Sequence, residues 1–239
     1  MPAIRSSPNR VVDKMPSSAT YFALKTADER LNWSPISNVA DGTTLTATFG
    51  WSPIGGGMHA TGLPAGVFAQ IVYGGRLIAA GWFDRAGDVP VRMIAAWDGS
   101  SWSDLGTGRG NSNGVVSLAV HQDRLIAGGG VGNSDDSPVC AWDGSWAPLG
   151  LGASGGNPTK VDAIAVYDNK LIVGGSFAEA GGIPCSNIAM WDGSSWSPLG
   201  SGVDGLVYSL VVYNGQLIVG GTFAIAGGYP AAYIASWSE

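Results

Sequence analysis

The stretch VDAIAVYDNKLIVGGSFAEAGGIPCSNIAMWDGSSWSPLGSG, residues 161–202, decides the fold because three other parts of the chain repeat it. The copy at 206–239 reads LVYSLVVYNGQLIVGGTFAIAGGYPAAYIASWSE, and two earlier copies start at Phe68 and Val115. One leucine marks the phase, with spacings of 48, 46 and 46 residues: Leu77, Leu125, Leu171 and Leu217. Periods near 45 residues with several strands per unit are typical of β-propeller blades.

Each copy divides into four expected strands separated by turn signals. Asn214-Gly215 and its counterparts tolerate the positive φ of a two-residue hairpin turn, and Asp-Gly pairs mark a second tight turn later in the copy. The segment between the second and third strands contains FxxAG and is expected to be a longer loop. The fourth strand reads WSPLG or a close variant, and its proline indicates a strand at a sheet edge.

The sequence therefore predicts an all-β fold, a four-bladed β-propeller over residues 46–239. The blades are expected at about 65–106, 115–150, 161–200 and 206–239. The last copy stops after its third strand, at Trp237, and residues 50–56 carry the fourth-strand text, with Trp51, Pro53 and Ile54. We expect this N-terminal strand to close the last blade, because open sheet edges favour aggregation. Trp33 begins the same tetrapeptide and is an alternative, as is a ring of eight blades made by two chains.

The repeats resemble kelch-type blades over about residues 51–239. The resemblance rests on paired glycines such as Gly174-Gly175, on the aromatic residue that ends the third strand, and on the tryptophan that opens the fourth. The form LIVGGxFxxAGG…IAxWDGSSWSPLG is most similar to repeats of Rax2-type cortical marker proteins and of many bacterial and viral surface proteins. The resemblance implies a fold and not a function, because this architecture hosts enzymes, lectins and scaffolds.

Composition excludes some classes of function. The net charge is −6, the pI is about 4.7, and no cluster of Lys and Arg is present, so nucleic acid is not an expected partner. No apolar run reaches the roughly 18 residues that span a bilayer, and the N-terminus lacks the apolar core of a secretory signal. We expect a virion or extracellular location reached by another route. Cys140 and Cys185 lie in different copies; a disulfide between them stays open, and Cys140 is interpreted as a small buried filler.

Residues 1–45 do not match the repeat and are polar, with many Ser, Pro and Asn residues. They could be a tail or a decoration on the side of the propeller. We interpret them as an extended N-terminal arm that docks onto other proteins of an assembly.

No group of residues in the sequence predicts a catalytic site, a metal site or a cofactor. The histidines are His59 and His121, and His121 occupies the position of Tyr73, Tyr167 and Tyr213 in the other copies, so a structural role is expected for it. Asp98, Asp143 and Asp192 recur once per copy in Asp-Gly turns, where aspartate is favoured for backbone reasons; calcium binding is the weaker interpretation.

Tryptophans suggest carbohydrate stacking, but eight of the ten occupy fixed repeat positions and are expected to pack between blades. Trp33 and Trp82 break the pattern. In a four-stranded blade the tight turns share one face of the ring, and the variable loops share the other. Because function resides on variable loops held by a rigid scaffold, we expect a ligand face there. Its candidate residues are Trp82, Arg85, Arg109, His59, Asp135 and Asp136.

The sequence thus favours a non-enzymatic structural or binding protein of a larger assembly, such as a phage virion decoration or fibre-associated component, that forms homo-oligomers or binds other proteins. A carbohydrate-binding propeller lectin is the alternative, and a kelch-type enzyme is the second alternative. Surface glycans are possible ligands, and neither nucleic acid nor a membrane is an expected partner.

Overall fold

The structure is a computed structural model that describes residues 51–62, 64–106, 114–130 and 137–238. Every regular element in these ranges is a β-strand, which confirms the predicted all-β propeller class. No helix within the described ranges is long and apolar enough to cross a membrane. The chain divides into two units between Ser52 and Pro53, and the description that follows concerns the second unit.

The described strands of the repeats form four antiparallel sheets, named blades 1 to 4, in which the strands pair in chain order. Blade 1 contains β2 (Gly66–Tyr73), β3 (Arg76–Trp82), β6 (Ile94–Trp97) and β7 (Trp102–Asp104). Blade 2 contains β8 (Val115–His121), β9 (Arg124–Gly129), β10 (Val139–Trp142) and β11 (Trp146–Pro148). Blade 3 contains β13 (Lys160–Tyr167), β14 (Lys170–Ser176), β17 (Ile188–Trp191) and β18 (Trp196–Pro198). Blade 4 contains β19 (Val207–Tyr213), β20 (Gln216–Gly221) and β23 (Ile234–Trp237).

The first and second strands of each blade are joined by the expected two-residue turn. Both turn residues have positive φ in every blade: Gly74-Gly75, Gln122-Asp123, Asp168-Asn169 and Asn214-Gly215. This is the type I′ geometry that matches the twist of a hairpin. Blade 2 adopts it with Gln122-Asp123, a pair without glycine or asparagine.

The segment between the second and third strands is a small hairpin, whereas the sequence predicted a loop. The hairpins are β4 (Arg85–Ala86) with β5 (Val89–Pro90), β15 (Glu179–Ala180) with β16 (Ile183–Pro184), and β21 (Ile225–Ala226) with β22 (Tyr229–Pro230). The strand before the blade adds to the first two hairpins: β1 (Met58–His59) pairs with β4, and β12 (Ala153–Ser154) with β15. The glycine pair in AGG, such as Gly181-Gly182, makes the hairpin turn with positive φ.

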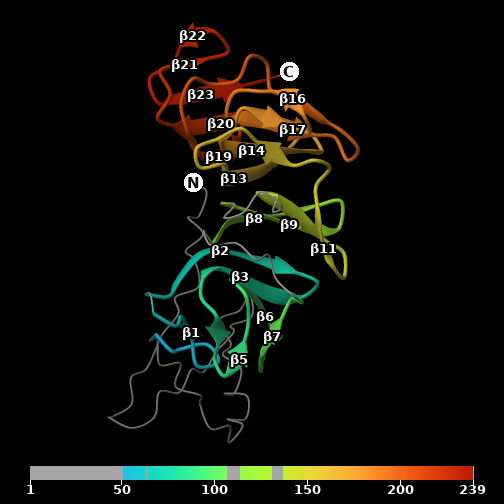
Figure 1. The fold of residues 1–239 in the computed structure, drawn as a ribbon, viewed down its shortest axis with the longest axis vertical. Helices are drawn as coiled ribbons and strands as arrows, with labels where there is room; N and C mark the ends of the chain where they lie inside the picture. The colour runs from blue at the N-terminus through green and yellow to red at the C-terminus, as the bar shows by residue number, and fades with distance from the viewer. Residues whose placement is uncertain (1–50, 63, 107–113, 131–136, 239) are drawn as a thin grey trace, which may run out of the picture. The chain divides into compact units, whose positions relative to one another are not determined.

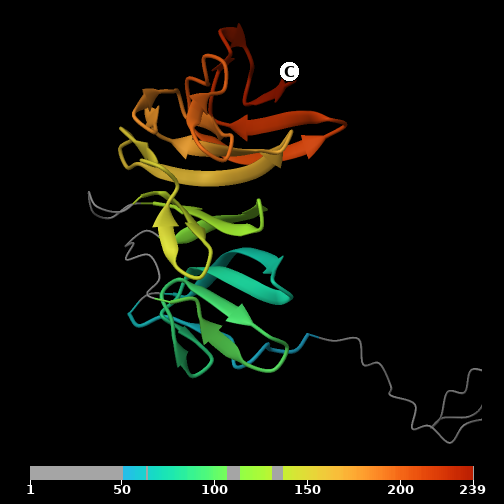
Figure 2. The same cartoon turned by 90° about the vertical axis from the view of Figure 1, so that its right-hand side faces the viewer.

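Neighbouring blades pack through a repeated contact between a glycine and a valine. A Cβ atom on Gly174 of β14 would collide with Val207 of β19, and one on Gly128 of β9 would lie 2.8 Å from Val161 of β13. The first strands of successive blades therefore lie against the second strands of the blades before them, and the sheets follow one another in chain order (Figure 1 and Figure 2). Hydrophobic clusters fill each junction; the cluster between blades 3 and 4 contains Ile172, Val207 and Leu217.

Tryptophans connect the blades as the repeat positions predicted. Nε1 of Trp146 in blade 2 donates to the carbonyl of Leu105 in blade 1 at 2.9 Å, and Nε1 of Trp196 in blade 3 donates to the carbonyl of Leu149 in blade 2 at 2.8 Å. Within a blade, the tryptophans that end the third strand and open the fourth lie close together; the ring centroids of Trp191 and Trp196 are 5.3 Å apart. Trp102, Trp191 and Trp196 are buried and form part of the core.

Within the described residues, the predicted closure of the last blade is not confirmed. Blade 4 has three strands, and no described residue of the segment 51–56 pairs with β23. Instead, the carbonyl of Ile54 accepts the Nε1–H of Trp102 at 3.3 Å, as the carbonyl of Leu105 does for Trp146. Ile54 thus lies on blade 1 where the end of a preceding fourth strand would lie. The alternative Trp33 lies outside the described residues.

The tryptophan bond between blades gives a stability prediction. Trp196→Phe removes one of two donors to the buried Leu149 carbonyl, which keeps the Gly152 N–H as its partner, so we expect the free energy of unfolding to fall by about 1 kcal/mol. Urea denaturation followed by circular dichroism measures the change. Leu151→Ala, which truncates an exposed side chain, is the control and should stay within about 0.5 kcal/mol of the wild type. Equal stability of Trp196→Phe and the control would contradict this role of the bond.

Candidate functional site

The face that carries the tight turns, called the turn face, contains aspartates whose carboxylates accept hydrogen bonds within their own turns. Oδ1 of Asp98 accepts the backbone N–H groups of Ser100 and Ser101, both at 2.8 Å, and Oδ2 accepts the Ser101 hydroxyl at 3.1 Å. Asp192 makes the same bonds with Ser194 and Ser195. The N–H group of Ser101, followed by that of Ser100, holds the pKa of Asp98 well below its ordinary value. This geometry supports the turn interpretation of these aspartates over calcium binding.

These turns predict a pH-dependent stability. The folded-state pKa of Asp98 and of Asp192 lies below the unfolded value, so each stabilises the fold above pH about 3.9 and loses that contribution as the pH falls toward the lowered pKa. We expect the double variant Asp98→Asn, Asp192→Asn to be less stable than the wild type at neutral pH. The difference should shrink below pH about 4, which urea denaturation at several pH values measures. Asp143→Asn is the control, because Asp143 faces Arg124. A difference that is constant with pH would contradict the prediction.

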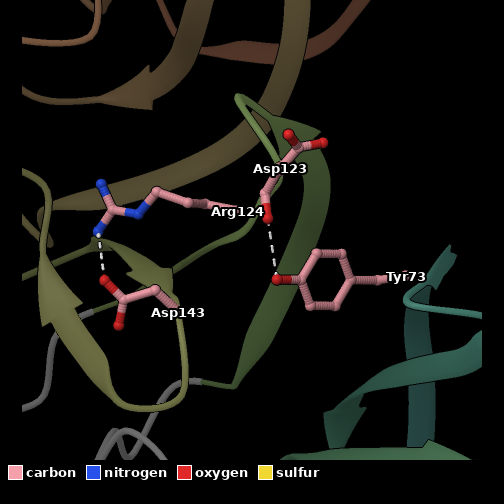
Figure 3. A network of polar contacts seen from close by, with 4 residues as sticks. All are labelled: Tyr73, Asp123, Arg124 and Asp143. Carbon is pink, nitrogen blue, oxygen red and sulfur yellow. Dashed lines mark hydrogen bonds and ion pairs between the residues drawn. The ribbon is translucent and has the colours of Figure 1, made fainter.

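Other polar groups on the turn face connect neighbouring blades (Figure 3). The Tyr73 hydroxyl of blade 1 donates to the Asp123 carbonyl of blade 2 at 3.0 Å, and Arg124 lies 3.8 Å from Asp143 within blade 2. His121, the counterpart of Tyr73 in blade 2, is buried, and its Nε2 lies 2.9 Å from the Asn169 carbonyl of blade 3. His121 is therefore a junction residue, in agreement with the structural role expected from its repeat position.

The structure brings together two of the predicted ligand-face residues, His59 and Arg85. They are cross-strand partners in the β1–β4 pair. Their side chains are engaged locally: His59 Nε2 lies 3.0 Å from the Gly56 carbonyl, and Arg85 donates to the Asp88 carbonyl at 2.8 Å. Asp84, a residue that the repeat pattern did not single out, accepts the Thr61 N–H at 2.8 Å. The Thr61 side chain, followed by this backbone N–H, lowers the pKa of the Asp84 carboxyl. These contacts order the hairpin of blade 1.

Trp82, the tryptophan outside the repeat pattern, is half-buried at the end of β3. Its indole lies against the Gly114 backbone, where a Cβ atom would fall 2.6 Å from the indole nitrogen. That nitrogen is buried and has no hydrogen-bond partner among the described residues. The indole thus packs on the start of blade 2 and does not present a free face for stacking. Arg109, Asp135 and Asp136, the remaining predicted ligand-face residues, lie outside the described residues.

A pocket of about 540 Å³ lies among the loops around blade 3, including the segment 198–204 that leads into blade 4. Polar residues contribute much of its lining, including Asn157, Ser176, Ser186 and Asp204. Asn187, also at the pocket, accepts the Phe177 N–H and donates to the Val203 carbonyl at 3.1 Å. No local sequence pattern predicted this pocket, because its lining comes from separate segments of the chain, 155–157, 176–178, 184–187 and 198–204.

A second hollow, of about 510 Å³, lies along the outer edge of blade 4. It is lined by Leu199, Val219, Gly227, Ala235 and Trp237, among others. Ala235 and Trp237 belong to β23, which pairs with β20 and with no other strand of the described residues. The Trp237 indole nitrogen is buried without a hydrogen-bond partner among the described residues.

The matching place in blade 3 is filled by Trp196. Its ring lies 5.3 Å from that of Trp191, its Nε1 donates to the Leu149 carbonyl, and it covers Gly181, where a Cβ atom would lie 2.8 Å from the indole. The repeat makes Trp237, Leu199 and Gly227 the counterparts of these three neighbours, and all three line the hollow of blade 4. The hollow therefore has the features that receive the tryptophan of a fourth strand.

The described residues show neither a metal-ligand cluster nor a disulfide. No group of three or more His, Cys, Asp or Glu residues in the described ranges could hold a metal ion. Cys140 and Cys185 are both buried and form no disulfide within the described residues, and Cys140 thus occupies the buried position that was expected for it. Burial, followed by the nearby Glu179 charge, raises the pKa of the Cys185 thiol to about 11. This thiol is therefore protonated and unreactive at neutral pH.

Comparison with known proteins supports the propeller. The family model described as the Rax2 C-terminal beta propeller domain matches residues 143–236, which confirms the resemblance to Rax2-type repeats. No curated protein sequence matches the chain. Among solved structures, the chain is similar to the crystal structure of the computationally designed Ika4 protein, with 14% identity and a TM-score of 0.45. That similarity covers 74% of this chain and 94% of the designed one.

Proposed function

We propose that this chain is a non-enzymatic binding protein that joins a larger assembly by accepting a strand at the open edge of blade 4. The observation that carries the proposal is the hollow beside Trp237, whose neighbours Leu199 and Gly227 match those that hold Trp196 in blade 3. Adding a strand to an exposed sheet edge is a common mode of recognition, in which main-chain bonds give affinity and side-chain pockets give specificity.

The edge strand and the hollow supply both components of such recognition. β23 has an unpaired outer edge whose N–H and C=O groups can bond an incoming strand. The hollow beside it selects a large aromatic side chain, since Gly227 leaves room on one side and Trp237 offers a ring on another. The expected ligand is therefore an extended segment of the form Trp-Ser-Pro, which is the form of the fourth strand in blade 3.

A virion or another extracellular particle is the setting that we propose, with the protein as a phage decoration or fibre-associated component and residues 1–45 as its docking segment. The support comes from the similarity of the repeat to those of bacterial and viral surface proteins. The docking segment lies outside the described residues.

Peptide binding tests the proposed edge. The protein would be the full chain carrying Trp51→Ala, so that its own Trp-Ser-Pro segment does not compete, and the probe a fluorescently labelled peptide with the sequence of residues 196–200. We expect saturable binding by fluorescence anisotropy. The same peptide with alanine in place of tryptophan is the matched control and should bind at least ~10-fold more weakly, because a well-packed buried aromatic side chain contributes well over 1.4 kcal/mol. Equal binding of the two peptides, or of neither, would refute the proposal.

Carbohydrate binding is a second candidate, favoured by the pocket of about 540 Å³ with its Asn, Ser and Asp lining. Hydroxyl and amide groups are the donors and acceptors that orient a sugar, and the pocket lies on the loop face. Trp82, the earlier candidate for stacking, is packed elsewhere.

A glycan array tests this second function. We expect the wild type to bind a subset of glycans, and Ser176→Tyr, which fills the pocket, to lose that binding. Trp82→Phe is the control and should retain it, because Trp82 lies outside the residues that line the pocket. An array without signal, or signal unchanged in Ser176→Tyr, would exclude this pocket as a glycan site.

A further inference from the structure

The outer face of blade 1 and the outer face of blade 4 are the two halves of the contact that joins the blades. Val115, Val161 and Val207 open the first strands of blades 2 to 4 and are at most 2% exposed, because each packs on the preceding blade. Val67, their counterpart in blade 1, is 41% exposed. At the other end, a Cβ atom on Gly174 would collide with Val207, whereas one on Gly220 would meet no atom outside its own blade.

Two further positions repeat this pattern at the outer face of blade 4. Ile234 is 65% exposed, whereas its counterparts Ile94, Val139 and Ile188 are at most 1% exposed. Tyr213 is also 65% exposed, whereas its counterpart in blade 1, Tyr73, donates to a carbonyl of the next blade. Large apolar side chains that are buried in every internal copy are therefore uncovered at one end of the array, which marks an interaction surface.

We propose that a second copy of this chain covers both end faces, head to tail, so that two chains form one closed ring and each inserts its Trp51 segment into the other's blade 4. This rests on the proposed strand-accepting edge and names its partner. Val67 of the second copy packs on Gly220, and Trp51 of the second copy fills the hollow beside Trp237. The surfaces complement each other because they repeat the three junctions inside the chain.

The geometry of the junctions points to a second copy rather than to closure within one chain. Blades 1 to 4 are joined by packed cores of the same kind, and with these junctions in place both ends remain exposed. Closing one chain on itself would require every junction to repack, which well-packed interiors resist. A second chain adds blades with unchanged junctions, and two sets of four give eight, within the usual range of about 4–8 for propellers. A head-to-tail interface that closes in this way forms a ring.

The repeat fixes the register of the inserted strand. In blade 3, Met190 pairs with Ser197 and Trp191 with Trp196. The same register in blade 4 places Ser236 opposite Ser52, and Trp237 opposite Trp51, of the second copy. Ile54, which follows Ser52, is already held on blade 1 of its own chain. Its carbonyl accepts the Trp102 indole N–H, as the end of a preceding fourth strand would. The Trp51 segment thus completes blade 4 of the other chain while it stays bound to blade 1 of its own chain.

A disulfide between two differently marked chains tests the proposal. Chains with Ser52→Cys and chains with Ser236→Cys are co-expressed, oxidised mildly and separated on a denaturing, non-reducing gel. We expect a covalent dimer of one chain of each kind, because directly paired residues of neighbouring strands lie within disulfide reach. Ser52→Cys with Ser209→Cys is the control and should not cross-link, since Ser209 lies on β19 at the opposite edge of the sheet. Both native cysteines are buried.

Two kinds of result would overturn the proposal. A single chain carrying both Ser52→Cys and Ser236→Cys would form an internal disulfide if its own segment closed blade 4, and it would then run as a monomer. A wild type that is monomeric, or that forms open fibres, in native mass spectrometry would also overturn the proposal.

Gly220→Val separates this inference from the strand-accepting function. A Cβ atom on Gly220 would meet only Ser209 within the chain, 2.5 Å from a hydroxyl that can rotate away, but would collide with Val67 of the second copy, so we expect a folded monomer instead of a dimer. Ser145→Val, in an exposed turn of blade 2, should remain dimeric. A dimeric Gly220→Val would refute the ring. Binding of the Trp-Ser-Pro-Leu-Gly peptide by a protein that is monomeric throughout would leave the strand-accepting edge intact and refute the second copy as its partner.

Discussion

The close approach of a glycine in the second strand of one blade to a valine in the first strand of the next is the contact on which the structure depends. At Gly128 and Gly174 the absent Cβ leaves the space that Val161 and Val207 fill. Any side chain there would push the sheets apart and expose the hydrophobic clusters between them. Blade 1 carries Ala80 at the matching position, fully buried in the cluster it shares with Val115 and Leu125, so this junction accommodates one extra methyl group. The spacing of the blades is therefore set by the smallest residues in the repeat.

Much of the fold follows from the sequence, because its signals are local and recur. The leucine and tryptophan spacings define the blades, and turns such as Asn214-Gly215 carry their geometry in their residue types. The small hairpins were missed although Gly181-Gly182 supplies the same kind of turn signal, because their strands are two residues long and too short to show alternation. The position of Ile54 depends on a contact between residues far apart in sequence. Its carbonyl accepts a hydrogen bond from Trp102 of blade 1, 48 residues away, and no local sequence pattern predicts that bond.

The candidate sites also divide into residues that the sequence pointed to and residues that it did not. Variation between copies drew attention to His59, Arg85 and Trp82, and the structure places these side chains in contacts that order the loops of blade 1. The hollow beside Trp237 involves residues that follow the repeat, such as Leu199 and Trp237, so departures from the repeat could not reveal it. In a repeat protein, a binding surface also arises where a regular residue lacks its regular neighbour. That is visible only when exposure is compared position by position across the copies.

The tryptophan bonds between blades also affect how the protein comes apart. Trp146 and Trp196 each tie a fourth strand to the blade before it, so among the described residues each blade is held by its immediate neighbours. Stability in such an array is a sum of nearest-neighbour contributions. Blades 2 and 3 have a neighbour on both sides, whereas β19 and β20 expose one face, so amide hydrogens in the isolated chain would exchange fastest in the outer sheets and slowest in the middle. Joining the ends would turn this gradient into a single cooperative unit.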